Sequence, residues 1–223
     1  MTQRELTEAR NWGRYFEDKA KQFGHAPAAA DHFNLRTFVI TRQHVISLIK
    51  ASGARRILDS GCGNGTMLEP ISRSVEICGL DLSPTMCQLS RTKGYMDVAV
   101  ASCEAIPYAS NTFDAALCAG LLQCLPSANR TVEELWRVLK PAGSLILVTS
   151  NAESIARRIL KNSDYVQMYR ANALINLCAS LGFTNMTVTP LFFPFAASFS
   201  TAAPSLLTRL VMASFIIKGT KQR

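Results

Sequence analysis

The pattern of hydrophobic and polar positions along the chain predicts alternating strands and helices. Short apolar runs at 55–59 and 75–80 are typical of buried strands, while apolar residues recur at helical spacing over 3–23 and 37–51. A further helix is predicted over 66–74, between the two strands. This alternation favours an α/β architecture, in which helices cover a mostly parallel sheet.

The turn after the first strand carries an acidic residue followed by three alternating glycines. Asp59 precedes Gly61, Gly63 and Gly65. Glycine allows positive φ and lets a ligand approach main-chain N–H groups, and the start of a helix adds unpaired donors that suit a carboxylate or phosphate. We expect Asp59 to accept a hydrogen bond from a ligand ammonium group. The alternative is a glycine-rich turn that binds no ligand.

The glycine spacing differs from that of the dinucleotide-binding fingerprint. In G-x-G-x-x-G the third glycine comes three residues after the second, and here that position holds Thr66. An amino-acid ligand, which has both a carboxylate and an ammonium group, suits the acid and the loop better than a pyrophosphate does.

A second acidic residue, Asp81, stands at the end of the second strand, twenty residues after Gly61. In a Rossmann-like unit an acid at this place hydrogen-bonds the ribose hydroxyls. The alternative is that Asp81 caps the next helix, since Asp81, Ser83 and Pro84 together form a good helix start. We predict Ser83 as the cap, which leaves Asp81 for a ligand.

These motifs resemble the class I S-adenosylmethionine-dependent methyltransferases, in particular their small-molecule (type 11-like) group. Three further segments are similar to family segments in the same order: 101–108 to the segment that lines the adenine, 112–118 to the fourth strand, and 135–148 to a helix, turn and fifth strand. The resemblance implies a three-layer Rossmann-like α/β sandwich with a mostly parallel seven-stranded sheet. Residues 211–218 are the candidate for its reversed edge strand.

The resemblance also implies S-adenosylmethionine as cofactor, bound at the carboxyl ends of the strands. Ser102 stands where relatives often have an acid that bonds the adenine amino group, and Cys103 would offer its backbone N–H to the ring. Glu104 is a further candidate, since its position often steadies the adenine loop. The cofactor-binding residues we expect are Asp59, Gly61, Cys62, Gly63, Asp81, Leu82, Ser102, Cys103 and Cys118.

No catalytic residue is predicted. Many relatives carry a His pair after the fourth strand, whereas residues 121–124 here read Leu-Leu-Gln-Cys. The three histidines of the chain, His25, His32 and His44, all precede the glycine-rich turn. His25 and His32 could reach a substrate and His44 is expected to be structural, but we assign none of them as a general base.

Composition agrees with one enzyme domain. The chain has 223 residues, of which 48% are hydrophobic, so it can bury a full core. Its seven cysteines show no metal-binding spacing, so no metal is expected, and we interpret them as reduced thiols of a cytoplasmic protein. No apolar run reaches the length of a membrane span, and residues 1–10 are too polar for a secretory signal.

The net charge of +8 does not by itself indicate a nucleic-acid partner. Basic residues are dispersed from Arg4 to Arg223, whereas nucleic-acid binders usually concentrate them on one face or in a recognisable module. The stretch after the predicted fourth strand also lacks the Asn/Asp-Pro-Pro-Tyr/Phe motif of many methyltransferases that act on nitrogen. We therefore favour a small-molecule partner.

The flanks of the chain should select the substrate. We expect an N-terminal helical lid over 1–52 and a methyltransferase domain over 53–223, with cap insertions near 152–170 and 190–208. The lid carries aromatic residues that either approach the cofactor and substrate or dock the helix, and the cap segments combine apolar residues with a basic rim. We predict methyl transfer to a small, apolar, natural-product-like or lipid-like metabolite. The alternatives are an RNA or protein methyltransferase and a non-catalytic cofactor-binding regulatory domain.

Overall fold

The computed structural model describes residues 3–30, 35–155, 168–192 and 212–222. For residues 3–11, 192 and 212 it describes the backbone alone. These residues form one seven-stranded sheet in the order β3-β2-β1-β4-β5-β7-β6. Strands β3, β2, β1, β4 and β5 are parallel, and β7 runs antiparallel to both β5 and β6. The strands are β1 Arg56–Ser60, β2 Glu76–Asp81, β3 Asp97–Val100, β4 Phe113–Ala119, β5 Leu139–Ser150, β6 Phe183–Phe192 and β7 Met212–Lys221.

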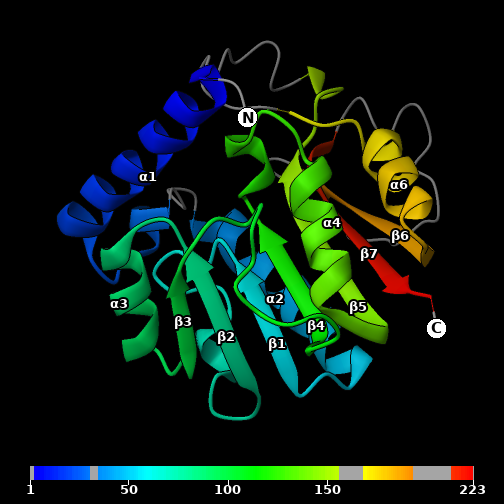
Figure 1. Ribbon diagram of the computed structural model, residues 1–223, viewed down its shortest axis with the longest axis horizontal. Coiled ribbons are helices and arrows are strands. Elements are labelled where there is room, and N and C mark those ends of the chain that lie inside the picture. Colours follow the sequence, from blue (N-terminus) through cyan, green and yellow to red (C-terminus); the bar gives the residue numbers. More distant parts are fainter. Residues whose placement is uncertain (1–2, 31–34, 156–167, 193–211, 223) are drawn as a thin grey trace.

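Helices cover both faces of the sheet, as Figure 1 shows, with α4 in front of the strands and α2 behind them. The described helices are α1 Gln3–Phe23, α2 Leu35–Ser52, α3 Pro84–Thr92, α4 Asn129–Val138 and α6 Ala171–Ser180, with short 3₁₀ turns at Pro27–Ala30, Glu69–Ile71 and Leu122–Cys124. The predicted three-layer sandwich and its seven-stranded sheet are therefore confirmed.

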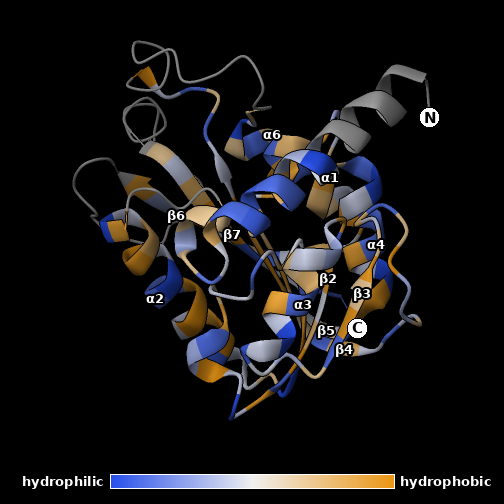
Figure 2. Ribbon diagram, turned by 90° about the vertical axis from the view of Figure 1, so that its left-hand side faces the viewer, coloured by the Kyte–Doolittle hydropathy of each residue, from blue (hydrophilic) through white to orange (hydrophobic). Residues whose placement is uncertain are grey.

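Each face of the sheet has its own hydrophobic core. Leu135 of α4 and Leu174 of α6 join one cluster, which includes Leu58 and Phe215 from the strands. On the other face, Ile49 of α2 packs against side chains of β1, β2 and β5. Figure 2 shows the hydrophobic colour concentrated on the strands between these helices. Burial on both faces explains why the strand sequences are continuous apolar runs.

The predicted strands appear within one residue of their expected starts, and the helices at 3–23 and 37–51 are confirmed as α1 and α2. The reversed strand is β7, which lies between β5 and the edge strand β6. Most of the predicted cap segments lie outside the described residues.

The predicted helix over 66–74 is wrong. Only a 3₁₀ turn forms there, at Glu69–Ile71. Pro70 would stand inside the predicted helix, where it has no N–H to donate and its ring clashes with the carbonyl of Thr66. The Asn64 side chain also accepts the Thr66 N–H and hydroxyl, at 3.4 and 2.7 Å. The glycine-rich turn is therefore not backed by a helix N-terminus.

Candidate functional site

A cavity of about 190 Å³ opens at the carboxyl ends of β1, β2 and β4. Parallel strands that end at a common edge bring residues from distant parts of the sequence together there, which is where α/β proteins bind ligands. Eight of the nine predicted cofactor-binding residues line this cavity: Asp59, Gly61, Cys62, Gly63, Asp81, Leu82, Ser102 and Cys103. Glu104 lines it too.

The ninth residue, Cys118, lies elsewhere. Its side chain is fully buried in the core cluster on the face of the sheet that α4 covers. Successive side chains of a strand point to opposite faces, and the next residue, Ala119, lines the cavity instead. The expected contact of Cys118 is thus not supported by the structure.

The three glycines of the turn all have positive φ, as expected, but they serve different purposes. Gly61 and Gly63 line the cavity. A Cβ on Gly65 would instead lie 3.0 Å from Ser90 Cα and 3.1 Å from Tyr95 Cε2. The first two glycines therefore lie at the surface of the cavity, whereas the third lets the loop pack on the protein beneath it.

The main-chain N–H groups of the turn bind mostly within the protein. Gly61 and Cys62 both donate to Leu80 O, at 2.8 and 2.9 Å, and Gly63 donates to Asp81 Oδ2 at 3.0 Å. The expectation that these N–H groups are open to a ligand is therefore wrong for this conformation. Recognition of a cationic group in the cavity depends on the carboxylates.

Asp59 is buried, with 2% of its surface exposed, yet it lines the cavity. The Tyr95 hydroxyl donates to its Oδ2 at 2.5 Å. Burial raises the pKa of Asp59 to about 7, against the lowering effect of the Tyr95 hydrogen bond. A carboxyl group with one oxygen held and with this pKa can bind an ammonium group near neutral pH.

Asp81 occupies the corresponding position at the end of β2. Its Oδ1 accepts from the Ser83 N–H at 2.9 Å and its Oδ2 from Gly63, so each oxygen already has one backbone donor. Each oxygen can still accept a further hydrogen bond. Ser83 caps α3, as predicted, because its hydroxyl accepts from the Met86 N–H at 3.0 Å.

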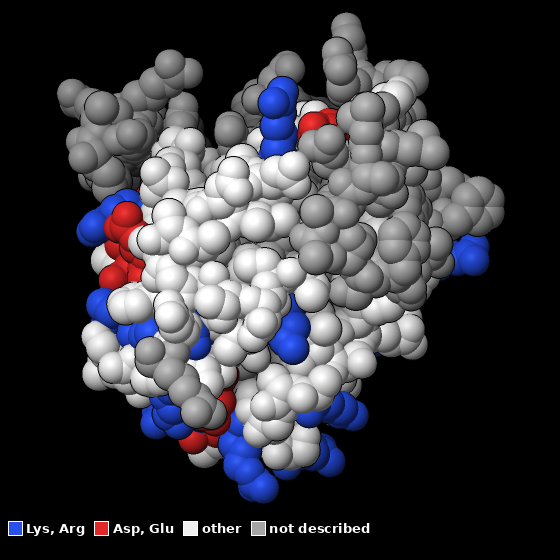
Figure 3. Space-filling model, turned by 90° about the vertical axis from the view of Figure 1, so that its right-hand side faces the viewer, with Lys and Arg blue, Asp and Glu red and all other residues white. Residues whose placement is uncertain are grey.

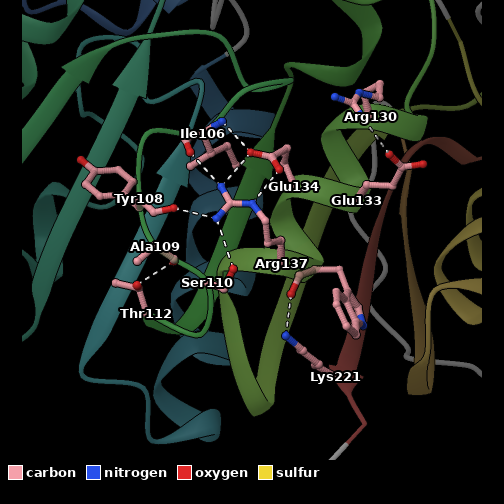
Figure 4. A network of polar contacts seen from close by, with 11 residues as sticks. Ile106, Tyr108, Ala109, Ser110, Thr112, Arg130, Glu133, Glu134, Arg137 and Lys221 are labelled. Carbon is pink, nitrogen blue, oxygen red and sulfur yellow. Dashed lines mark hydrogen bonds and ion pairs between the residues drawn. The ribbon is translucent and has the colours of Figure 1, made fainter.

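Two residues of α4 hold the loop that forms the next wall of the cavity (Figure 4). Glu134 Oε2 accepts from the Ile106 N–H at 2.7 Å, and Arg137 donates to Ile106 O and Tyr108 O, both at 2.8 Å. Arg137 and Glu134 also form a two-point ion pair at 2.7 and 2.8 Å. This clamp fixes the loop that presents Ser102, and nothing in the sequence pattern indicated it.

Helix α1 lies beside α3 (Figure 1) and contributes residues to the lining of the cavity. Trp12, Gly13 and Phe16 line the cavity, and the two aromatic rings stack with centroids 5.9 Å apart. Glu17 attaches the helix to α3, since it accepts from the Ser83 and Thr85 hydroxyls, both at 2.6 Å. These hydrogen bonds hold the pKa of Glu17 down at about 2.

The chain that follows α1 is tied to the glycine-rich turn. The Asn64 side-chain amide donates to Gly24 O at 3.0 Å and to Ala26 O at 2.8 Å. Asn64 is fully buried. Asn64 therefore connects the glycine-rich turn to the segment that follows α1.

The segment after β4 supplies an apolar wall. Gly120, Leu121 and Leu125 line the cavity, and Gln123 lines it with its Oε1 accepting from the Ser150 hydroxyl at 3.0 Å. Among the described residues, no histidine lines the cavity: His25 borders a separate open basin and His44 lies on α2, while His32 is outside the described residues.

The basic side chains on the surface do not gather in one patch. On the face shown in Figure 3, Lys and Arg side chains of the described residues stand at separate points rather than in one patch. All seven cysteines are buried, and none of them forms a disulfide with another described cysteine. No described helix is both long enough and apolar enough to cross a membrane.

Comparison with known proteins agrees with this geometry. Residues 58–147 match the family model described as a methyltransferase domain. Over 118 residues the chain is 32% identical to a ubiquinone/menaquinone biosynthesis C-methyltransferase of Geobacter sulfurreducens, covering 48% of this chain and 46% of the relative. It is 33% identical over 129 residues to a tRNA (carboxymethyluridine(34)-5-O)-methyltransferase of Arabidopsis thaliana, covering 56% and 31%. The chain thus spans less than half the length of these curated relatives.

The fold is shared across nearly the whole chain with a solved structure. A methyltransferase of Thermotoga maritima, described as S-adenosylmethionine-dependent and a possible histamine N-methyltransferase, superposes with a TM-score of 0.74. The match covers 94% of this chain and 99% of the other at 21% identity. The description of that structure names S-adenosylmethionine, which is the cofactor that the sequence resemblance implied. Residues 58–147 match the methyltransferase domain family, and the chain shares the fold of the solved methyltransferase structure.

Proposed function

We propose that this chain transfers the methyl group of S-adenosylmethionine to a small, mostly apolar metabolite. The observation that carries the proposal is one cavity with a carboxylate at the end of each of two adjacent strands, Asp59 and Asp81, and a largely apolar lining elsewhere. In this assignment Asp59 binds the ammonium group of the methionine part and Asp81 the ribose hydroxyls.

The residues present suit the remaining parts of the cofactor. Ser102 and Cys103 line the cavity and are proposed to bind adenine, and Leu82 adds an apolar wall. Gly63 also lines the cavity, and a Cβ there would lie 3.3 Å from Ala30 Cβ, so its lack of a side chain lets the turn approach the segment after α1. Helix α1, within the lid proposed for 1–52, brings Trp12 and Phe16 to the same cavity, where an aromatic face can stabilise a cation by about 0.5–2 kcal/mol.

S-adenosylmethionine, when bound, supplies a methyl group on a positively charged sulfur. The protein binds and aligns this group with the acceptor and excludes water, and alignment can contribute up to about 7–11 kcal/mol. The acceptor forms a bond to the methyl carbon as the carbon–sulfur bond breaks, and the electron pair of that bond stays on sulfur. Any acceptor proton passes to solvent, because we assign no general base to the described residues.

Two observations favour a small apolar acceptor over RNA. The wall after β4 is formed by Leu121, Leu125 and the neighbouring Cys124, and no continuous basic patch appears on the face in Figure 3. RNA remains the second candidate, since one relative is named for tRNA. Strong salt dependence of binding would favour it, because phosphate contacts release counterions.

Two measurements test the proposal. Calorimetry should show S-adenosylmethionine binding to the wild-type protein and a loss of affinity on the order of tenfold or more for Asp81→Asn, which removes a charged hydrogen-bond acceptor. Incubation with methyl-tritiated cofactor and cell extract should place label in the organic-solvent fraction. Label in RNA would favour the second candidate, and the absence of any S-adenosylhomocysteine would favour a non-catalytic binding domain.

A further inference from the structure

Tyr95 lies beneath the cavity without lining it. It sits in the turn between α3 and β3, and only 3% of its surface is exposed. Its hydroxyl donates to Asp59 Oδ2 at 2.5 Å. Since that oxygen is held from below, Oδ1 of Asp59 is the oxygen available to a group bound in the cavity.

Two glycines make room for the Tyr95 ring. A Cβ on Gly65, in the glycine-rich turn, would lie 3.1 Å from Tyr95 Cε2, and a Cβ on Gly79, in β2, would lie 3.0 Å from Tyr95 Cδ1. Both distances are shorter than an ordinary van der Waals contact of 3.4–4 Å, so the ring occupies space that side chains at these positions would need. The ring therefore packs against the turn and the strand between which the cavity forms.

We propose that Tyr95 is a positioning residue for cofactor recognition, which holds the Asp59 carboxylate so that its second oxygen meets the ammonium group of the cofactor. The proposal rests on the proposed function, because it takes that ammonium group as the ligand of Asp59. The Tyr95 ring also supports the glycine-rich turn in the position in which Gly61 and Gly63 line the cavity.

The charges around Asp59 make the hydroxyl important near neutral pH. Burial and the neighbouring Asp81 raise the pKa of Asp59, and the Tyr95 hydrogen bond lowers it. The charge of Asp59 also acts on the thiols of Cys62 and Cys118. A hydrogen bond with Cys87 and burial raise the pKa of Cys62, and burial raises the pKa of Cys118, so both thiols stay neutral. The pKa of Tyr95 itself is raised, so the hydroxyl keeps its proton and remains a donor.

Removal of this hydroxyl should therefore raise the pKa of Asp59. Only the ionised carboxylate pairs well with an ammonium group, so affinity for a ligand that carries this group should increase as pH rises through about 7 in the wild-type protein. In Tyr95→Phe the midpoint should move to higher pH. A ligand without the ammonium group should show neither effect.

The experiment uses calorimetry with two probes, S-adenosylhomocysteine and 5′-methylthioadenosine, which keeps the nucleoside but lacks the amino-acid part. For Tyr95→Phe we expect on the order of tenfold weaker binding of S-adenosylhomocysteine at pH 7, as for the loss of a hydrogen bond to a charged group, and unchanged binding of 5′-methylthioadenosine. Tyr169→Phe is the matched control, since its hydroxyl donates to Leu122 O at 3.1 Å rather than to Asp59.

The outcomes separate the two proposals. Equal weakening of both probes, or an unshifted pH midpoint in Tyr95→Phe, would overturn the positioning role and leave the proposed function standing. Failure of the wild-type protein to bind S-adenosylhomocysteine would overturn the proposed function and this role with it. Should Tyr95→Phe fail to fold, Asp59→Asn decides the matter: it should abolish the pH dependence of S-adenosylhomocysteine binding, and a retained dependence refutes the role.

Discussion

Replacement of Gly65 by alanine tests whether the third glycine of the motif is required for packing. Gly65 has a φ of +76°, and a Cβ there would meet Ser90 Cα at 3.0 Å, Ser90 Cβ at 3.1 Å and the Tyr95 ring at 3.1 Å. An alanine at this position should lower the free energy of unfolding in two ways, through its backbone conformation and through its contacts. Comparison with a second glycine allows the two contributions to be measured separately.

Gly53, just after α2, is that second glycine. Its φ is +68°, but a Cβ there would have nothing within 4 Å. Gly53→Ala should therefore lower the free energy of unfolding by the conformational cost alone, about 1–2 kcal/mol. Gly65→Ala should add about 1–3 kcal/mol for overpacking against Ser90 and the Tyr95 ring. We expect a total loss of about 2–5 kcal/mol for Gly65→Ala.

The assay is equilibrium unfolding in urea, compared at constant m so that only the midpoint reports stability. The difference between the two variants isolates the contact cost, because both share the positive φ. If Gly65→Ala costs no more than Gly53→Ala, the packing explanation is refuted. The glycine would then have to be explained by the ligand, and its substitution should weaken cofactor binding without loss of stability.

Three further substitutions test the contacts around the cavity and the sheet. Glu17→Gln should lower the free energy of unfolding by about 1 kcal/mol in urea, since a neutral amide accepts hydrogen bonds less strongly than a carboxylate. The pKa of Glu17 is lowered from 4.5 to about 2, so the wild-type contribution should be complete above the higher value and be lost progressively as pH falls to the lower one. Arg137→Lys should raise KM for the cofactor several-fold with kcat nearly unchanged. A lysine cannot donate to the carbonyls of Ile106 and Tyr108 and also keep the ion pair with Glu134. A fall in kcat alone would contradict the proposed role of Arg137 in fixing the loop. Lys221→Met should cost about 2–4 kcal/mol in thermal unfolding, since the buried Lys221 ammonium group donates to three acceptors, of which Leu139 O is buried. An unchanged Tm would contradict this role.

The parts of the fold and site that could be predicted depend on local patterns. Asp59 and Asp81 each follow a short apolar run, and the ends of parallel strands meet at one edge, so their proximity follows from strand assignment alone. The wrong helix over 66–74 shows the limit of periodicity, because Pro70 outweighed an apolar pattern that suited a helix.

The parts that could not be predicted join residues far apart in the chain. Tyr95 lies 36 positions from Asp59, and Glu134 lies 28 from Ile106. No spacing rule connects such pairs, since their contact depends on how α3 and α4 pack against the sheet. The misplacement of Cys118 has a different cause: a predicted strand that is correct within one residue still leaves open which side chains face the cavity.

The order of the strands has a consequence for how the chain acquires its structure during synthesis. Among the strands that the structure describes, β6 pairs with β7 alone, and β7 joins it to β5, yet β7 is made after both. A nascent chain that ends before residue 212 therefore exposes two unpaired strand edges, which are places where chains associate wrongly. Until the ribosome has released β7, the five parallel strands can assemble alone, and the cavity belongs to that earlier part.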